Sequence, residues 1–166
     1  MSIGNAAITL GSRYPHHTPK KEGWRRTISF AWGTHAEQRA AQSLALSPAP
    51  SYLDWSYHGI IRFLCGDYAG AVECSNRGNS VGKSQSAWKA AALYYLGEID
   101  LAREEAKLFL NGIRSFWVGK GAPTDEAITR WMLQAHPIGN KARWEVLRNG
   151  LRGAGLPVEG IVPLSA

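Results

Sequence analysis

A short pattern that occurs twice constrains the fold of this chain more than any other feature of its sequence. Each copy is the end of an apolar stretch, closed by glycine and followed by an acidic residue, a large apolar side chain and, three positions further on, alanine. The copies lie 31 residues apart, at 64–71 and 95–102. Glycine is common just after one helix, and an acidic side chain is common at the start of the next. Repetition at this spacing predicts stacked helical hairpins, which bind partners through a surface.

The composition permits one domain with an apolar core. The chain has 166 residues, of which 45% are hydrophobic, and a formal net charge of +6. Residues 1–50 contain six Lys and Arg against two Glu, whereas residues 51–166 contain thirteen basic and eleven acidic side chains. Most of the positive charge therefore lies in the N-terminal segment. We interpret it as a solvated leader rather than a nucleic-acid-binding surface.

Cysteine usage and hydropathy favour a cytoplasmic protein. Cys65 and Cys74 lie in apolar stretches without the spacing of a disulfide framework or a zinc site, and we interpret them as buried free thiols. His16 and His17 have no third potential ligand nearby, so neither a metal nor another cofactor is expected. No apolar run approaches the ~20 residues that span a bilayer, and residues 1–10 lack the features of a secretory signal.

The spacing of the apolar residues predicts an all-α fold. Residues 1–33 show no sustained period and are interpreted as a poorly ordered basic leader, with a short extended piece at 27–32. Residues 34–157 are the predicted helical domain, without any strand pattern, and 158–166 are a tail. The predicted helices cover about 35–46, 52–65, 68–78, 85–96, 99–113, 125–135 and 141–152. Their predicted N-caps include Ser51, Asp67, Thr124 and Asn140.

The first copy of the pattern resembles the tetratricopeptide repeat (TPR), a pair of antiparallel helices about 34 residues long. With Ala71 at the small-residue position of the second helix, the other positions that match the family are Trp55, Gly59, Gly66 and Tyr68. Gly59 would let the two helices approach closely. Trp55 and Tyr68 would fill the space beside it and close over Ala71.

The second copy matches the family at fewer positions. Ala90, Gly97, Ile99 and Ala102 fit, but Ser86 stands where the family has tryptophan. The resemblance therefore implies about two full hairpins, as a TPR-like fragment of an α-solenoid.

Both ends of the array are also recognisable in the sequence. Upstream, a half-repeat has Ala36 at the small-residue position and Pro48 where the family ends its second helix. Downstream, a pair of C-terminal helices is expected to cap the array, with Trp144, Val146 and Leu147 covering its open end.

The segment 136–157, with its finish Leu-Arg-Gly-Ala-Gly-Leu-Pro, resembles the closing segment of a group of bacterial regulators, many from rhizobia. In those proteins a class III adenylate/guanylate cyclase or a winged-helix domain precedes a TPR array. The likeness covers about 35–157. Only about 35 residues precede the repeats here, and no paired metal-binding carboxylates of a cyclase are found. The resemblance implies a truncated or stand-alone C-terminal TPR region of an adenylate cyclase-type signalling regulator.

Three motifs that could indicate an enzyme have simpler interpretations. Gly78–Ser84 is similar to a phosphate-binding loop, but only three residues separate Gly78 from Gly82 and a helix precedes it, so we predict a turn between repeats. His58 and His136 lie in or beside helices and are interpreted as packed or capping side chains. No Ser/His/Asp or Cys/His set has ordered spacing, and no catalysis is expected.

Tryptophan content supports one alternative function. The seven tryptophans, at 24, 32, 55, 88, 117, 131 and 144, could stack on bases in a helical-repeat RNA-binding protein, which a pI near 9.5 would suit. Core packing is the ordinary use of those at 55, 88, 131 and 144, because they lie in predicted helices. Phe116 and Trp117 adjoin a glycine-rich loop and are predicted to be partly exposed, either as a binding hot spot or as a cover over one end.

The resemblance also implies where a partner would bind. TPR arrays that bind peptides use polar side chains on the concave face, mostly from first helices, which here gives His58, Arg62, Lys89 and Tyr94. A basic pair such as Arg62 and Lys89 would suit an acidic peptide or a carboxylate. The charged run 103–107 is interpreted as a solvated surface. The predicted function is non-catalytic binding of a protein or peptide, or regulation of a cyclase or DNA-binding domain.

Overall fold

In this computed structural model, residues 42, 45–46, 49–79, 82–118, 120–136 and 138–163 are described. Their regular elements are helices, with no strand among them, so the all-α prediction is confirmed. The helices are α3 (Tyr52–Leu64), α4 (Tyr68–Arg77), α5 (Gln85–Tyr95), α6 (Ile99–Arg114), α7 (Asp125–Ala135) and α8 (Lys141–Gly153). In this part of the chain no helix is long and apolar enough to cross a membrane. The basic leader, the extended piece at 27–32, His16, His17 and most of the half-repeat lie outside the described residues.

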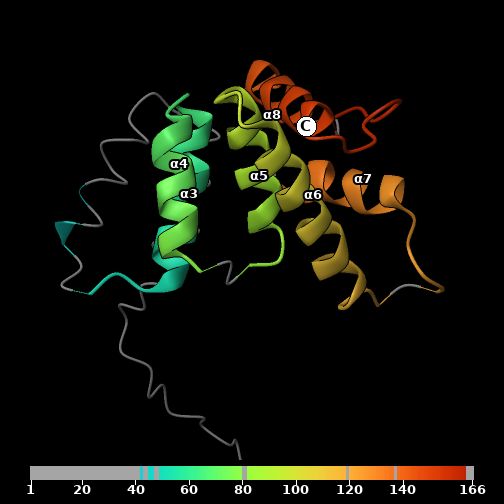
Figure 1. Cartoon of the computed structure of the whole chain (residues 1–166), viewed down its shortest axis with the longest axis horizontal. Coiled ribbons are helices and arrows are strands. Elements are labelled where there is room, and N and C mark those ends of the chain that lie inside the picture. Colours follow the sequence, from blue (N-terminus) through green and yellow to red (C-terminus); the bar gives the residue numbers. More distant parts are fainter. Residues whose placement is uncertain are drawn as a thin grey trace, which may run out of the picture.

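Helices α3 and α4 form the first pair and pack along each other (Figure 1). They are joined by a corner at Gly66, whose φ is +85°. The hydroxyl of Ser51 accepts a hydrogen bond from the Asp54 amide at 3.3 Å, and the Asp54 carboxylate accepts one from the Ser51 amide at 3.0 Å. This is a complete capping box. The Asp67 carboxylate caps α4 by accepting a hydrogen bond from the Gly70 amide at 2.9 Å, so both predicted N-caps are confirmed.

Helices α5 and α6 form the second pair, with a corner at Gly97. The φ of Gly97 is +83°, close to the +85° of Gly66, and both values belong to the left-handed region that favours glycine. Glu98, the N-cap residue of α6, has nearly the same backbone conformation as Asp67, the N-cap residue of α4. The Glu98 side chain nevertheless makes no capping hydrogen bond. The two corners therefore share their backbone geometry, and they differ in how the second helix is capped.

Helix α5 is the centre of the fold and packs against α3, α4, α6 and α8 (Figure 1). Its four small residues, Ala87, Ala90, Ala91 and Ala92, are completely buried. Side chains this small let several neighbouring helices approach one helix closely. Trp88 is 1% exposed and meets the ring of Phe63 edge-on at 5.4 Å, which fills the remaining space on the α3 side.

A buried polar junction joins α3, α4 and α5. Nε2 of Gln85 donates hydrogen bonds to the Ser56 carbonyl at 3.2 Å and to the Ser75 hydroxyl at 3.1 Å. A Cβ atom on Gly59 would lie 3.1 Å from Nε2 of Gln85 and 3.2 Å from the carbonyl oxygen of Ala71. Gly59 thus marks a close approach of the three helices, and the Gln85 hydrogen bonds satisfy the polar groups buried there.

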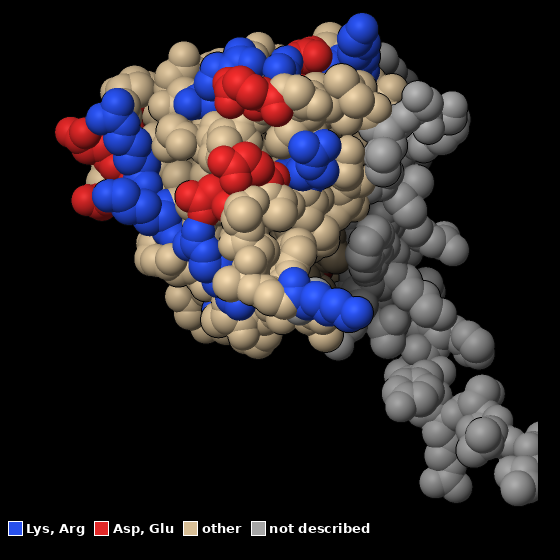
Figure 2. Space-filling model, turned by 90° about the vertical axis from the view of Figure 1, so that its right-hand side faces the viewer, with Lys and Arg blue, Asp and Glu red and all other residues tan. Residues whose placement is uncertain are grey.

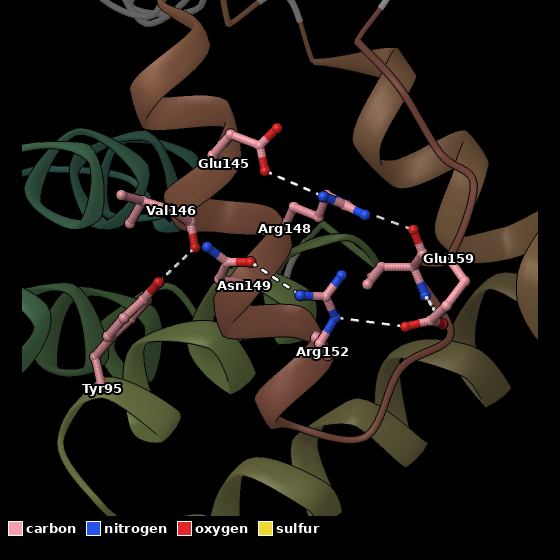
Figure 3. A network of polar contacts seen from close by, with 8 residues as sticks. Tyr95, Glu145, Val146, Arg148, Asn149, Arg152 and Glu159 are labelled. Atoms are coloured by element: carbon pink, nitrogen blue, oxygen red, sulfur yellow. Dashed lines mark hydrogen bonds and ion pairs between the residues drawn. The ribbon is translucent and has the colours of Figure 1, made fainter.

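Helix α8 lies against α5 through two of its glycines. A Cβ atom on Gly150 would lie 2.8 Å from Cβ of Ala91, and one on Gly153 would overlap the ring of Tyr94. The Tyr95 hydroxyl donates a hydrogen bond to the Val146 carbonyl at 2.8 Å (Figure 3). Helix α8 can therefore pack closely on α5 because it has no side chains at these two contacts.

The chain returns to the core after α8. Val158 and Ile161 are 0% and 2% exposed, so the packed region extends past the predicted domain end. Two arginines of α8 hold this segment (Figure 3): Arg152 pairs with Glu159 at 3.4 Å, and Nε of Arg148 donates to the Val158 carbonyl at 3.5 Å.

The predictions for buried tryptophans and cysteines are confirmed in part. Trp88, Trp144 and Cys74 are buried, as expected. Cys65 is exposed, which corrects the expectation that it is buried, because it ends α3 where the chain turns away at the corner. Trp131 is 40% exposed, since it lies beside the buried face of α7 and no described helix covers it.

Candidate interaction surface

The two basic residues predicted to bind a partner, Arg62 and Lys89, already form ion pairs with carboxylates of the same chain. Arg62 forms an ion pair with Asp67 at the corner between α3 and α4. Nζ of Lys89 lies 2.5 Å from Oε1 of Glu105, with only 21% and 13% of these side chains exposed. The expectation of a solvated face at Glu105 is wrong, because this residue of α6 points to α5 and is largely shielded by that pairing.

Of the other two predicted binding residues, one is buried and one packs against α8. His58 is 3% exposed. Tyr94 is half-buried, lies against Gly153 of α8 and meets Tyr95 edge-on with ring centroids 5.3 Å apart. The structure therefore does not gather the four residues on one open face. Their role in binding stays a prediction.

The residues that define the first copy of the pattern take part in local packing. Ala71 is 2% exposed. The ring of Tyr68 lies 5.4 Å from Phe63, and it stacks on the ring of Tyr95 with centroids 4.5 Å apart. Trp55 is half-buried, with the guanidinium of Arg77 4.7 Å above its ring. Tyr68 thus links the first helix pair to the second.

The second copy differs in burial from the first at one of the matched positions. Its small residue, Ala102, is completely buried, and Ala90 is too. Ile99 is partly buried, as is its counterpart Tyr68. Ser86 is 8% exposed, whereas Trp55, the tryptophan of the first copy, is half-buried.

An apolar groove lies where α6 and α7 meet. Its volume is about 420 Å³, and its lining consists of Ile113, Phe116, Trp117, Val118 and Trp131. Ile113 is buried, whereas Phe116, Val118 and Trp131 are 66%, 98% and 40% exposed. Contiguous exposed apolar side chains of this size are uncommon on a protein that has no partner.

The groove exists because α6 and α7 touch over a short length. Helix α6 ends at Arg114, and the aromatic pair Phe116 and Trp117 follows immediately. Helix α7 starts after the Thr124 cap, whose hydroxyl accepts from the Ala127 amide at 3.2 Å, and an Arg114–Asp125 ion pair ties the two helix ends together. Among the described residues, no helix covers the side chains between these ends.

Two of the five residues that line this groove, Phe116 and Trp117, were predicted from the sequence to be partly exposed. Partial exposure of Phe116 and Trp117 is confirmed. Trp131 and Val118 were missed: Trp131 has helical spacing that predicts core packing, and a single valine in a loop has no periodic signal. Only the position of α7 brings them together.

The charged side chains of the described residues are distributed rather than gathered. Figure 2 shows the side on which α7 lies in Figure 1, with Lys and Arg interspersed among Asp and Glu. Ion pairs with carboxylates engage Arg62, Arg77, Lys89, Arg103, Arg114, Arg148 and Arg152. These pairings reduce the free positive charge that the described residues could offer to a nucleic-acid backbone.

Three observations on the described residues concern metal binding, thiol reactivity and the motif that resembles a phosphate-binding loop. No cluster of three or more His, Cys, Asp or Glu side chains that could hold a metal is found there. Burial raises the pKa of the Cys74 thiol, which disfavours a reactive thiolate. The motif that begins at Gly78 and is similar to a phosphate-binding loop connects α4 to α5. The element before it is therefore a helix, whereas a phosphate-binding loop follows a β-strand.

Comparisons with protein-family models, with curated proteins and with solved structures gave no match.

Proposed function

We propose that this chain is a TPR-like helical module that binds another protein and performs no chemistry of its own. The observation that carries this proposal is that a helix pair joined at a glycine corner occurs twice. Helices α3 and α4, and then α5 and α6, form pairs with a glycine corner of the same φ, and the two pairs pack side by side. In repeat proteins such pairs shelter one another's apolar faces and leave an extended binding surface.

The proposal includes the origin that the closing motif implies. The chain acts in the bacterial cytoplasm as a C-terminal TPR region of an adenylate cyclase-type signalling regulator, either stand-alone or truncated. The closing motif has a structural use that supports this origin: Gly153 leaves room for Tyr94, and Gly155 has a φ of +90° at the end of α8. Sequencing the gene upstream tests it. A cyclase or winged-helix remnant is expected there, and an unrelated gene would contradict it.

The groove between α6 and α7 is the better candidate surface for the partner. Arg62 and Lys89 would have to exchange internal carboxylates for external ones, which offsets much of the gain. Phe116 and Trp131 need no such exchange, because burying their exposed apolar surface is favourable by about 25 cal/mol per Å².

Affinity capture with the full chain tests the binding function. The immobilised protein is exposed to a bacterial lysate, with and without ribonuclease, and retained proteins are quantified by mass spectrometry. We expect a defined protein that is retained in near-stoichiometric amount, resists ribonuclease and is competed by free chain. Retention that disappears with ribonuclease would favour the RNA-binding alternative. Retention of no protein above a bare-matrix control would contradict the proposal.

A further inference from the structure

The groove between α6 and α7 has the dimensions of a docking site for side chains of a partner. Its volume of about 420 Å³ lies within the range of ligand pockets in proteins. Buried Ile113 forms one wall, and exposed Phe116 and Trp131 supply aromatic surface, the residue type that most often dominates binding energy.

The architecture around the groove favours a helical occupant. The groove lies between Ile113 of α6 and Trp131 of α7, and the segment that follows α6 supplies the rest of its lining. An amphipathic helix laid between two helices buries residues at i, i+3, i+4 and i+7. A peptide that binds by adding a β-strand would need the open edge of a sheet, and the described ranges contain no strand.

The charges beside the groove favour an acidic occupant. The Lys83 ammonium lies 5.4 Å from the centre of the Phe116 ring. Lys120 and Arg130 are exposed and lie within two residues of Val118 and Trp131 in the sequence. Carboxylates that flank the apolar stripe of a partner helix would therefore meet cations at the rim.

The same charge balance disfavours a second copy of this chain as the occupant. Two copies that met at this groove would bring together their Lys83, Lys120 and Arg130 side chains, and like charges repel each other. An acidic partner is attracted by that charge, and long-range attraction accelerates its encounter with the groove.

We propose that the groove formed by Ile113, Phe116, Trp117, Val118 and Trp131 binds an acidic amphipathic helix of a partner protein, with apolar side chains in the groove and carboxylates facing Lys83 and its neighbours. This inference rests on the proposed binding function and assigns that function a surface and a partner chemistry.

A selection from a displayed library of random 16-residue peptides tests the proposal, using the full chain as bait. Enriched peptides are expected to combine apolar residues at i, i+3, i+4 and i+7 with an excess of Asp and Glu. One enriched peptide is then synthesised with a fluorescent label, and its Kd is measured by anisotropy.

Four variants locate the binding site. Phe116→Ser and Val118→Ser change exposed residues of the groove, and each is expected to weaken binding at least about tenfold. Leu108→Ser changes an exposed residue of α6 outside the lining, with 59% exposure against 66% for Phe116, and is expected to leave the Kd unchanged. Lys83→Glu is expected to weaken binding about threefold to tenfold at low salt, and less at high salt.

Each remaining outcome overturns a distinct statement. Peptides that bind equally well to Phe116→Ser and to the unchanged protein would overturn the groove assignment while leaving the binding function intact. Enriched peptides without an acidic excess would overturn the partner chemistry. If no peptide is enriched, and a concentration-dependent dimer is lost in Phe116→Ser, the groove instead joins two copies of this chain.

Discussion

Single glycines at the contacts between helices determine how closely those helices pack. Gly150 of α8 and Gly112 of α6 both lie in helices, but their surroundings differ. A Cβ on Gly150 would lie 2.8 Å from the Cβ of Ala91 and 3.1 Å from its Cα, whereas one on Gly112 would meet only the flexible side chain of Lys83 at 3.4 Å or more. The same substitution should therefore have opposite effects at the two sites.

Gly150→Ala is expected to destabilise the fold. Overpacking against α5 costs about 1–3 kcal/mol, which exceeds the ~1 kcal/mol that alanine gains over glycine in a helix. Gly112→Ala is the matched control, and it should raise the free energy of unfolding by about 0.5–1 kcal/mol because no clash opposes the gain. Urea denaturation followed by circular dichroism measures both. Equal effects would contradict the close packing of α8 on α5.

His136 gives the fold a dependence on pH. Burial lowers the pKa of its imidazole, although the Met132 carbonyl 3.1 Å from Nδ1 acts in the opposite direction. The ring meets Trp88 edge-on at 5.3 Å. In the unfolded chain the pKa is near 6.5, so below that pH the unfolded state binds more protons than the folded state.

The Tm is therefore expected to fall as the pH is lowered from 7.5 through about 6.5 towards the depressed pKa. His136→Gln removes this titration and should make the decline in Tm shallower over the same range. Thermal unfolding of both proteins in a series of buffers measures the difference. Parallel curves for the two proteins would show that His136 does not contribute.

At the scale of elements, the two corners have N-cap residues with similar backbone conformations, but only one of these residues makes a capping hydrogen bond. The φ and ψ of Asp67 are −84° and 77°, and those of Glu98 are −84° and 64°. Only the shorter side chain reaches the amide three residues on. An aspartate at position 98 should therefore reach the amide of Leu101.

Glu98→Asp is expected to stabilise the protein by about 0.5–1 kcal/mol through a new N-cap hydrogen bond on α6. Glu98→Gln keeps the length of the side chain and serves as the control, without a gain. Chemical denaturation gives both values. A Glu98→Asp protein no more stable than Glu98→Gln would mean that the cap does not form.

At the scale of the whole molecule, the segment after α8 closes the core. Ile161 is 2% exposed, whereas the adjacent Val162 is 66% exposed. Ile161→Ala should lower the free energy of unfolding by about 2–4 kcal/mol, because it removes buried methyl groups. Val162→Ala should change it by less than about 0.5 kcal/mol. Comparable small losses for both variants would show that this segment does not belong to the folded unit.

The boundaries of the helices were predictable because their signals are local. Each N-cap and each glycine corner acts through backbone groups within a few residues. The N-caps are Ser51, Asp67, Thr124 and Asn140. For α3 to α8 the predicted ends accordingly agree with the structure to within about two residues, whereas most of the predicted helix at 35–46 lies outside the described residues.

The surface, in contrast, depended on contacts between distant residues. Lys89 could be listed as a free cation from sequence alone, because nothing local shows that Glu105 of the next helix will pair with it. Trp131 has the spacing of a core residue, and its exposure follows from the absence of a covering helix among the described elements.

The sequence by itself determined the helical class, the corners and the caps, since these follow from backbone preferences and hydrogen bonds over one turn of helix. Tertiary structure alone decided that α8 packs on α5, that Ile161 belongs to the core and that an apolar groove stays open beside α7. The physical reason is that α5 presents small apolar side chains on several sides, so local pattern cannot specify which helix covers each of them.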